Sequence, residues 1–393
     1  MANISRAAAI VGAAESDELG YLENRKSDLQ LLVEAASNAL DDAGLKKSDV
    51  DAIFSSGNTM GFAEHMGIIP RFTDGTSVGG SSFVIHAGHA LAAIAAGYCE
   101  VALVVHGSAG HSRRFFGGGG GIEGGGPASP GGQFETPYGY IGAPINYSMA
   151  CARYMHEFGE DRCREAMSEI AVSTRKWAAL NPRALIHDPA AEIPLTMSFE
   201  DYHNSRWISW PFHLLDCCLV TDAGGAYVIT TPERARDLKK PPVWILGAGE
   251  GHDHGMISQM PSLTSLIARE TGPRAFEMAG VTHDDFDLAL IYDSFTYTVL
   301  LTLESLGFCA RGEAADFVRG QRTAPGGDFP LNTAGGGLSY THPGAYGIFL
   351  VIEAIRQLRG EAGARQVPNA KLTFCHGTGG SLSSGGTAVL AVD

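Results

Sequence analysis

The chain has 393 residues, of which 45% are hydrophobic and 18% are charged. This length exceeds what one small core fills, so the sequence predicts two domains or a duplicated pair, with much buried surface and a large oligomer interface. The formal net charge of −15, with no basic tract to offset it, argues against duplex nucleic acid as the partner, although local Arg and Lys side chains can still hold an anionic ligand.

Cysteine spacing and hydropathy indicate the compartment. Seven cysteines occur at irregular spacings with no Cys-x-x-Cys pair, which predicts reduced thiols, no structural zinc and a cytoplasmic protein. The N-terminus leads directly into a predicted strand at residues 7–11, without a signal-peptide pattern. No uninterrupted apolar run is long enough to cross a bilayer, so we expect no association with a membrane.

A repeat divides the chain. Residues 39–54 resemble residues 275–290 without a gap, at an offset of 236 (279 − 43). Each copy predicts a helix that ends at an Ala-Gly C-cap, then an acidic turn and a buried strand, and an earlier strand with a glycine precedes each copy. The sequence therefore predicts an α/β protein built from two βαβ-rich halves, residues 1–235 and 236–393.

The N-terminal half contains a predicted insert at about residues 107–212. It starts with a glycine-rich tract that includes Gly117–Gly121, which is either a surface excursion or a lid over a site. Amphipathic patterns then predict helices over 147–158 and 162–179, and Pro182 ends the second one. We expect this insert to cover a substrate.

Two glycine-bracketed patches contain titratable side chains that suit a functional site. The first, residues 332–347, packs glycines around one histidine and two tyrosines before an apolar helical pattern. The second, residues 374–380, places a thiol beside a histidine between two strand-like runs. Glycines let the backbone approach a ligand, so the chemistry is expected at the side chains between them. These side chains are Tyr340, His342, Tyr346, Cys375 and His376.

Together with two further segments, these patches resemble the thiolase superfamily, and sterol-carrier-type thiolase-like proteins in particular. The further segments are Gly79-Gly80-Ser81-Ser82, before an apolar helix, and Tyr292-Asp293-Ser294-Phe295, after an apolar strand. The resemblance covers essentially the whole chain. It implies a homodimer of five-layered αβαβα subunits, with coenzyme A (CoA) lying across the insert and its thioester reaching the junction of the two halves.

Two departures from the family pattern bear on the chemistry. A thiolase has its nucleophilic cysteine at the start of a helix, at a position that corresponds here to about Gly80 or Ser81. Tyr292 stands where thiolases have an Asn or a His that helps to hold an oxyanion. Claisen chemistry needs a thiolate to carry the acyl group, whereas a tyrosine hydroxyl donates a hydrogen bond or exchanges a proton. The departures favour retro-aldol cleavage of a β-hydroxyacyl-CoA, which needs no nucleophile.

This combination resembles the thiolase-like aldolases that shorten steroid side chains as CoA thioesters. Those enzymes work with a small OB-fold, zinc-ribbon partner protein, so a separate partner chain is expected here. By this resemblance, His342 and His376 hold the thioester enolate. Tyr292, together with Tyr340 or Tyr346, supplies the acid and the base.

Four residues are predicted to bind the CoA part of the substrate, and no permanently bound cofactor is expected. Arg175 and Lys176 suit its phosphates, although solvated surface charge is the commoner role of such residues. Ser81 and Gly336 complete the predicted set. No metal site is expected, since two histidines three residues apart on one helix, at positions 86 and 89, lack a third ligand.

Two alternative functions stay open. One is a β-ketoacyl-CoA thiolase or acyltransferase with a displaced nucleophile, for which Cys375 is the candidate. The other is a non-catalytic scaffold that binds lipid or CoA ester, in which His342 only caps a turn and Tyr292 is a buried aromatic. Thiolysis consumes free CoA and forms an acyl-enzyme, whereas retro-aldol cleavage does neither.

Overall fold

The computed structural model describes residues 3–113, 128–140 and 142–393. Nine strands form one sheet in the order β3-β2-β4-β7-β1-β8-β11-β10-β9, and β5 and β6 form a separate hairpin. The strands are β1 (Ala9–Glu15), β2 (Ala52–Phe54), β3 (Phe72–Asp74), β4 (Val101–Ala109), β5 (Trp207–Ser209), β6 (Phe212–His213), β7 (Asp222–Thr230), β8 (Val243–His252), β9 (Leu288–Ile291), β10 (Leu372–Gly379) and β11 (Ser384–Ala391).

The two ends of the large sheet repeat one strand order. In the N-terminal part, β2 is parallel to β3 and β4, and β7 is antiparallel to β4 and β1. In the C-terminal part, β9 is parallel to β10, and β11 is antiparallel to β10 and β8. Leu331 forms a parallel bridge to Ala289 of β9, at the place that β3 takes beside β2. The first strand of each part is therefore the one nearest the middle of the sheet.

The two parts join where β1 meets β8. This antiparallel contact consists of two residue pairs, Ala9 with Trp244 and Ile10 with Val243. The division of the chain at residues 235 and 236 stays a prediction, and it falls at the end of helix α8 (Pro232–Arg236).

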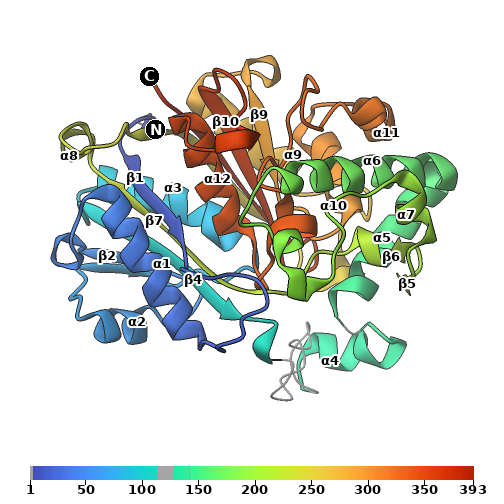
Figure 1. Cartoon of the computed structure of the whole chain (residues 1–393), viewed down its shortest axis with the longest axis horizontal. Coiled ribbons are helices and arrows are strands. Elements are labelled where there is room, and N and C mark those ends of the chain that lie inside the picture. The colour runs from blue at the N-terminus through green and yellow to red at the C-terminus, as the bar shows by residue number, and fades with distance from the viewer. Residues whose placement is uncertain (1–2, 114–127, 141) are drawn as a thin grey trace.

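Helices cover the outer face of each part of the sheet and also lie between the two parts. This gives five layers, αβαβα (Figure 1). On one outer side, α1 (Asp28–Ala43) packs against β1, β4 and β7. On the other outer side, α9 (Ala268–Ala279) packs against β8 and β11. Between them, α3 (Ser82–Ala95) and α12 (Gly347–Arg359) contact strands of both parts and each other. This arrangement confirms the predicted αβαβα thiolase fold.

Local sequence explains where these helices begin and end. A capping box formed by Ser27 and Gln30 starts α1. Gly44 ends α1 at φ 70°, and Gly280 ends α9 at φ 71°, so both C-caps predicted from the repeat are confirmed. In contrast, α3 is apolar around most of its circumference because it is buried between two layers.

The insert forms the predicted pair of helices, α5 (Ala143–Phe158) and α6 (Glu160–Ala179). The glycine run Gly117–Gly121 lies outside the described residues, so the choice between a surface excursion and a lid stays a prediction. The remaining α-helices among the described residues are α2 (Thr59–Met66), α4 (Pro130–Phe134), α7 (Phe199–Asn204), α8 (Pro232–Arg236), α10 (Thr296–Leu306) and α11 (Ala314–Val318), and Gly336–Tyr340 form a π-helix.

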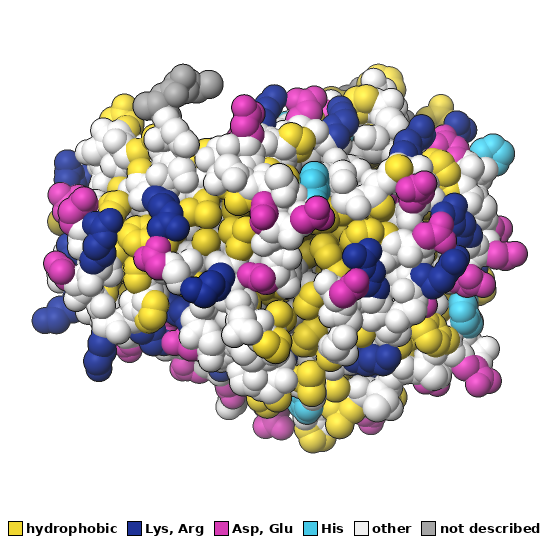
Figure 2. Space-filling model, turned by 90° about the horizontal axis from the view of Figure 1, so that it is seen from above, with side chains coloured by type: hydrophobic (Ala, Val, Ile, Leu, Met, Phe, Trp, Pro, Cys, Tyr) yellow, Lys and Arg dark blue, Asp and Glu magenta, His cyan; other side chains and the backbone are white. Residues whose placement is uncertain are grey.

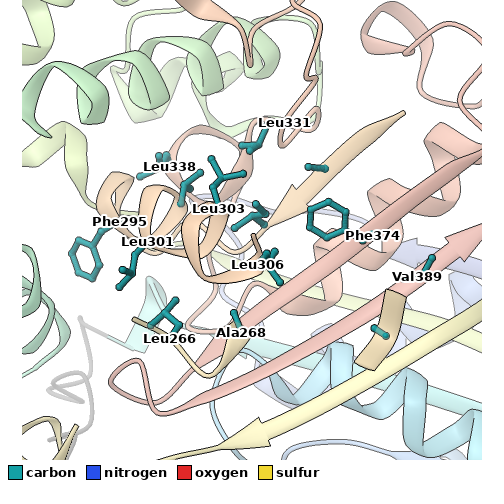
Figure 3. Close-up of a cluster of buried hydrophobic side chains, with 14 of the residues drawn as sticks. Leu266, Ala268, Phe295, Leu301, Leu303, Leu306, Leu331, Leu338, Phe374 and Val389 are labelled. Atoms are coloured by element: carbon teal, nitrogen blue, oxygen red, sulfur yellow. The ribbon is translucent and has the colours of Figure 1, made fainter. Parts of the chain in front are cut away.

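A buried apolar cluster reaches from the C-terminal part of the sheet to the predicted site (Figure 3). Leu303 and Leu306 of α10 belong to it, as does Phe374 of β10. Leu338, from the glycine-rich segment 332–347, is buried in the same cluster. The core therefore fixes this segment, which is not a surface loop.

Charged side chains are spread over the surface and are not gathered in one large patch on the face shown in Figure 2, as the charge content of 18% leads us to expect. Lys and Arg side chains are interspersed with Asp and Glu over the face shown in Figure 2, with apolar side chains between them. Within the part of the chain that the structure describes, no helix combines the length and the apolar character needed to cross a membrane.

Candidate active site

Tyr292 is the centre of a buried polar cluster. It directly follows β9, and its hydroxyl oxygen lies 2.8 Å from Nε2 of His342. The same hydroxyl accepts the backbone N–H of Tyr346 at 3.1 Å. The Tyr292 ring stands edge-on to the rings of both residues, and its exposed fraction is 4%. The structure thus brings together three of the predicted catalytic residues.

The turn that carries His342 is anchored to the N-terminal part of the sheet. The backbone N–H of His342 donates to Oγ1 of Thr221 at 2.9 Å, and the N–H of Thr221 donates to the His342 carbonyl at 3.2 Å. The hydroxyls of Thr221 and Thr341 lie 2.8 Å apart. A ring nitrogen of His106, on β4, lies 3.3 Å from the carbonyl oxygen of Pro343. The site therefore spans the junction of the two parts.

A carboxyl group beneath the glycine turn explains the glycines there. Asp293 accepts the N–H groups of Gly337 at 2.7 Å and Leu338 at 3.3 Å. Gly336 has φ 59°, and a Cβ atom on it would lie 1.9 Å from Oδ2 of Asp293. Gly336, a predicted CoA-binding residue, is thus packed against this carboxyl, where only glycine fits.

Asn332 supports Tyr292 from the other side. Its side-chain oxygen accepts the N–H of Ile291 at 2.9 Å, and its side-chain nitrogen donates to the Ile291 carbonyl at 2.8 Å. The amide group therefore takes the place of a strand backbone beside the last residue of β9, and it fixes the point from which Tyr292 projects.

Burial sets the protonation states of the cluster. It lowers the pKa of His342 to about 4, so this imidazole is neutral near pH 7. It raises the pKa of Tyr292 well above its ordinary value, so the hydroxyl is protonated. In the neutral tautomer whose proton is on Nδ1, Nε2 of His342 accepts the Tyr292 hydroxyl proton while the Tyr292 oxygen accepts the N–H of Tyr346. Burial also raises the pKa of Asp293 to about 7, which makes it the member of the cluster that titrates near neutrality.

The segment before α3 approaches Tyr292 at Gly80. A Cβ atom on Gly80 would lie 2.2 Å from Cε2 of the Tyr292 ring, so position 80 faces the cluster. Ser81, predicted to bind CoA, points elsewhere, since its Oγ lies 2.7 Å from Oγ of Ser384 and donates to the Val78 carbonyl at 3.1 Å. Neither position presents a nucleophile to Tyr292.

The structure does not bring His376 into the cluster. Side chains alternate between the faces of a strand, and on β10 a Cβ atom at Gly377 would meet Ser81, beside the middle layer. His376 therefore faces the outer layer, where its Nδ1 lies 2.8 Å from Oγ1 of Thr387, which in turn bonds to Thr271 of α9. His376 thus contacts Thr387 and not the Tyr292 hydroxyl, and the enolate role predicted for it stays a prediction.

Tyr340 is also engaged away from Tyr292, and Cys375 is a fully buried thiol. Burial raises the pKa of the Cys375 thiol, which disfavours a thiolate. The Tyr340 hydroxyl donates to Oε1 of Glu15 at 2.6 Å, and Arg356 forms an ion pair with the same carboxylate. Arg356 holds the pKa of Glu15 at about 2 despite its burial, so this is a stable charged network beneath the site.

The two adjacent basic residues of α6 have different surroundings. Arg175 is buried and donates to Oγ of Ser339 at 2.9 Å and to the Pro194 carbonyl at 2.7 Å. Lys176 is exposed and lines a surface hollow of about 520 Å³ together with Arg319 and Arg322. Of the two predicted phosphate ligands, only Lys176 is free to meet a solvent-borne anion.

Two residues at this site, Asp293 and His106, are not among the site residues predicted from the sequence. Asp293 belongs to the segment 292–295, and its place next to Tyr292, after a buried strand, is a usable signal. His106 gave no local signal, because it reaches Pro343 only through the pairing of the sheet. These two residues complete the polar surroundings of the turn.

The histidines of α3 form a separate group. Nδ1 of His89 lies 2.5 Å from Oδ2 of Asp74, and its Nε2 lies 2.5 Å from Oε2 of Glu250. Among residues 3–113, 128–140 and 142–393, no group of three or more His, Cys, Asp or Glu side chains has an arrangement that holds a metal ion.

Comparisons with known proteins show which family the chain is similar to. Residues 249–392 match the family described as "Thiolase C-terminal domain-like". A "Steroid side-chain-cleaving aldolase" of Thermomonospora curvata is 36% identical over 376 residues, which are 92% of each chain. A "17-hydroxy-3-oxo-4-pregnene-20-carboxyl-CoA lyase" of Mycobacterium tuberculosis is 35% identical over 375 residues, 91% of this chain and 92% of the relative.

A solved structure described as "Ltp2-ChsH2(DUF35) aldolase" matches with a TM-score of 0.86 and 32% sequence identity, over 99% of both chains. The similarity therefore extends through both parts of the sheet and the insert. On these grounds the chain belongs to the thiolase superfamily, where it is similar to proteins named as aldolases and lyases.

Proposed function

We propose that the protein cleaves a carbon–carbon bond in a bulky, steroid-like β-hydroxyacyl-CoA by a retro-aldol reaction that releases a carbonyl compound and a shorter acyl-CoA. The observation that carries this proposal is the hydrogen bond between Tyr292 and neutral His342, at a site where the helix-start position is Gly80 and not a cysteine. The names of two relatives, a steroid side-chain-cleaving aldolase and a pregnene-carboxyl-CoA lyase, support the same substrate class.

Tyr292 and His342 act together as the base. The substrate hydroxyl gives its proton to the Tyr292 oxygen while Tyr292 passes its own proton to Nε2 of His342. The Cα–Cβ bond then breaks, the β-carbon becomes a carbonyl, and the electron pair stays on Cα as the thioester enolate. Since the pKa of Tyr292 is raised by burial, its phenolate exists only within this relay.

The same pair returns the proton. His342 passes it back through Tyr292 to Cα, which completes the shorter acyl-CoA, so the reaction needs no external acid, base or oxidant. The enolate lies beside the amino end of α3, where the helix dipole favours negative charge. The N–H of Tyr346 holds the Tyr292 oxygen in line throughout.

Lys176 binds the phosphates of the CoA moiety in the hollow that it lines with Arg319 and Arg322. Those two arginines already pair with Asp316 and Asp328, which leaves Lys176 as the charge best suited to a new anion. CoA enters only as part of the substrate, and no permanently bound cofactor takes part.

The protein works in the cytoplasm as a homodimer with a separate small OB-fold, zinc-ribbon partner. The description of the similar solved structure names two components, an Ltp2 chain and a ChsH2 (DUF35) chain, which supports a partner for this chain as well. The seven cysteines are all unbridged, which suits a reducing compartment.

A product assay tests this function. The protein, with and without the candidate partner, is given β-hydroxyacyl-CoA esters of increasing bulk in the absence of free CoA, and products are identified by mass spectrometry. We expect a carbonyl compound and a shorter acyl-CoA. Cleavage of β-ketoacyl-CoA that requires free CoA, with an acyl adduct on Cys375, would instead establish a thiolase.

A further inference from the structure

We propose that Gly80 selects the reaction type, because a side chain at position 80 and the ring of Tyr292 cannot occupy the site together. The chemical part of this inference rests on the proposed function, whereas the steric part does not. Position 80 is thus a specificity-determining residue even though glycine has no reactive group.

The overlap between the two positions is severe. A Cβ atom on Gly80 would lie 2.2 Å from Cε2, 2.6 Å from Cζ and 2.8 Å from the hydroxyl oxygen of Tyr292. All three distances are far below the roughly 3.5–4.0 Å at which nonbonded heavy atoms meet favourably. The ring of Tyr292 therefore fills the volume that any other side chain at position 80 would need.

The Tyr292 ring cannot move aside without losing the hydrogen bonds of its hydroxyl. Its hydroxyl is held by His342 and by the N–H of Tyr346, and its ring is buried edge-on to both of their rings. A swing of the ring breaks both hydrogen bonds. Because these bonds define the proposed proton relay, a larger residue at position 80 removes the relay as well as straining the packing.

The backbone at position 80 is fixed as firmly as the ring. A Cβ atom on Gly347 would lie 2.1 Å from the carbonyl oxygen of Gly80, so α12 begins directly against it. A Cβ atom on Gly79 would lie 2.4 Å from the backbone nitrogen of Gly380. The Gly79 carbonyl also accepts the Ser82 hydroxyl at 2.7 Å. The segment is held on both sides, so strain at position 80 falls on Tyr292.

This exclusion has a chemical consequence. Position 80 lies two residues before α3, at a helix N-terminus, where the pKa of a thiol falls and nucleophilic catalysis is favoured. A thiol at this place carries an acyl group, whereas glycine yields the space to a tyrosine that exchanges protons. One pair of positions, 80 and 292, thereby decides between covalent acyl transfer and acid–base cleavage.

A double-mutant cycle tests the steric part without any substrate. We expect Gly80→Ala to lower the melting temperature by more than about 3 °C in the wild-type and Tyr292→Phe backgrounds, since both keep the ring. In the Tyr292→Ala background, where the ring is gone, the same change is expected to cost less than a third of that shift. Equal losses in all three backgrounds would overturn the inference.

The chemical part is tested with a thiol. Gly80→Cys is combined with Tyr292→Ala, and the protein is incubated with a short acyl-CoA thioester. The thiol attacks the thioester carbonyl, CoA leaves as the free thiol, and the chain gains the mass of the acyl group. We expect this adduct on the double variant and not on Tyr292→Ala alone, and its absence from the folded double variant would refute the assignment.

The two proposals fail separately. If wild-type protein cleaves no β-hydroxyacyl-CoA but the cycle shows the expected coupling, the proposed function is wrong and the steric exclusion stands. If cleavage is seen and Gly80→Ala keeps more than about a tenth of it, the exclusion is wrong and the function stands. Misplacement of the relay by about 1 Å is expected to cost about 100-fold in kcat/KM.

Discussion

His342 and His376 both lie in buried segments rich in glycine, and burial lowers the pKa of each imidazole, to about 4 and about 3. Their surroundings nevertheless differ. His342 meets the Tyr292 hydroxyl at the junction of the two parts of the sheet, whereas His376 meets Thr387 on the outer face. A glycine-rich context and a neutral imidazole therefore do not define a catalytic histidine. The two histidines differ instead in the side chains that their rings contact.

The largest effect is expected from the partner of His342. Tyr292→Phe keeps the ring and removes the hydroxyl, so it is expected to lower kcat/KM for a β-hydroxyacyl-CoA by about 1,000-fold. Tyr340→Phe is the matched control, because its hydroxyl bonds to Glu15 outside the cluster. It is expected to lower stability while keeping kcat/KM within about threefold. Similar rate losses in the two variants would remove the distinction between the two tyrosines.

The histidines themselves give the next test. His342→Gln removes the proton acceptor of Tyr292, and we expect a loss of about 100-fold in kcat at unchanged melting temperature. His376→Gln keeps a polar group near Thr387 and is expected to retain most of kcat. Steady-state kinetics and thermal unfolding of both variants decide the matter. A larger loss of kcat at position 376 than at 342 would reverse the comparison.

Asp293, which bonds to the segment that carries His342, is expected to make the free energy of unfolding depend on pH. Its folded pKa is raised from 3.8 to about 7 by burial, so between about pH 4 and pH 7 the folded state binds more protons than the unfolded state. This carboxyl therefore lowers the free energy of unfolding as pH rises through that window, by up to about 1.4 kcal/mol per pH unit.

Asp293→Asn keeps the acceptor for Gly337 but does not titrate, so the pH dependence is expected to lose that downward contribution. Urea unfolding at pH 5, 6 and 7 measures the difference from wild type. Thr387→Val, beside His376, serves as the control and should keep the wild-type slope. Parallel curves for wild type and Asp293→Asn would contradict a carboxyl that titrates near neutrality.

The smallest effect is expected at the adjacent basic residues of α6. Lys176→Ala is expected to raise KM for the CoA ester about fivefold, with kcat and melting temperature unchanged, because an exposed ion pair contributes about 1 kcal/mol. Arg175→Ala leaves the Ser339 hydroxyl and the Pro194 carbonyl without their donor, so it is expected to lower stability. An unchanged KM for Lys176→Ala would remove the hollow from the CoA site.

Much of the fold was predictable because the repeat preserves local signals. Both helices end at a glycine C-cap, Gly44 and Gly280, and a buried strand follows each of them as predicted. The apolar pattern located both helices of the insert. The resemblance to thiolases then supplied the layers. The position at which the two parts of the sheet join was not readable from these local patterns.

The site was only partly predictable, for a physical reason. Every residue from position 373 to 379 on β10 is buried, so no alternation of polar and apolar residues reveals which face His376 takes. Likewise, residues 336–340 form a π-helix, so α-helical spacing does not show that Tyr340 meets Glu15 while Tyr346 meets Tyr292. Pairing across the sheet, which no local pattern encodes, decides both.

The amide group of Asn332 also has a consequence for assembly. It occupies the N–H and C=O groups of Ile291 on the outer edge of β9, and Ala289 on that edge already bonds to the backbone at Pro330 and Asn332. An outermost strand with free backbone groups invites a strand from another molecule. Here the Asn332 side chain and the bridge at Leu331 occupy the backbone groups of that edge. Copies of the chain therefore cannot associate by adding a strand to β9.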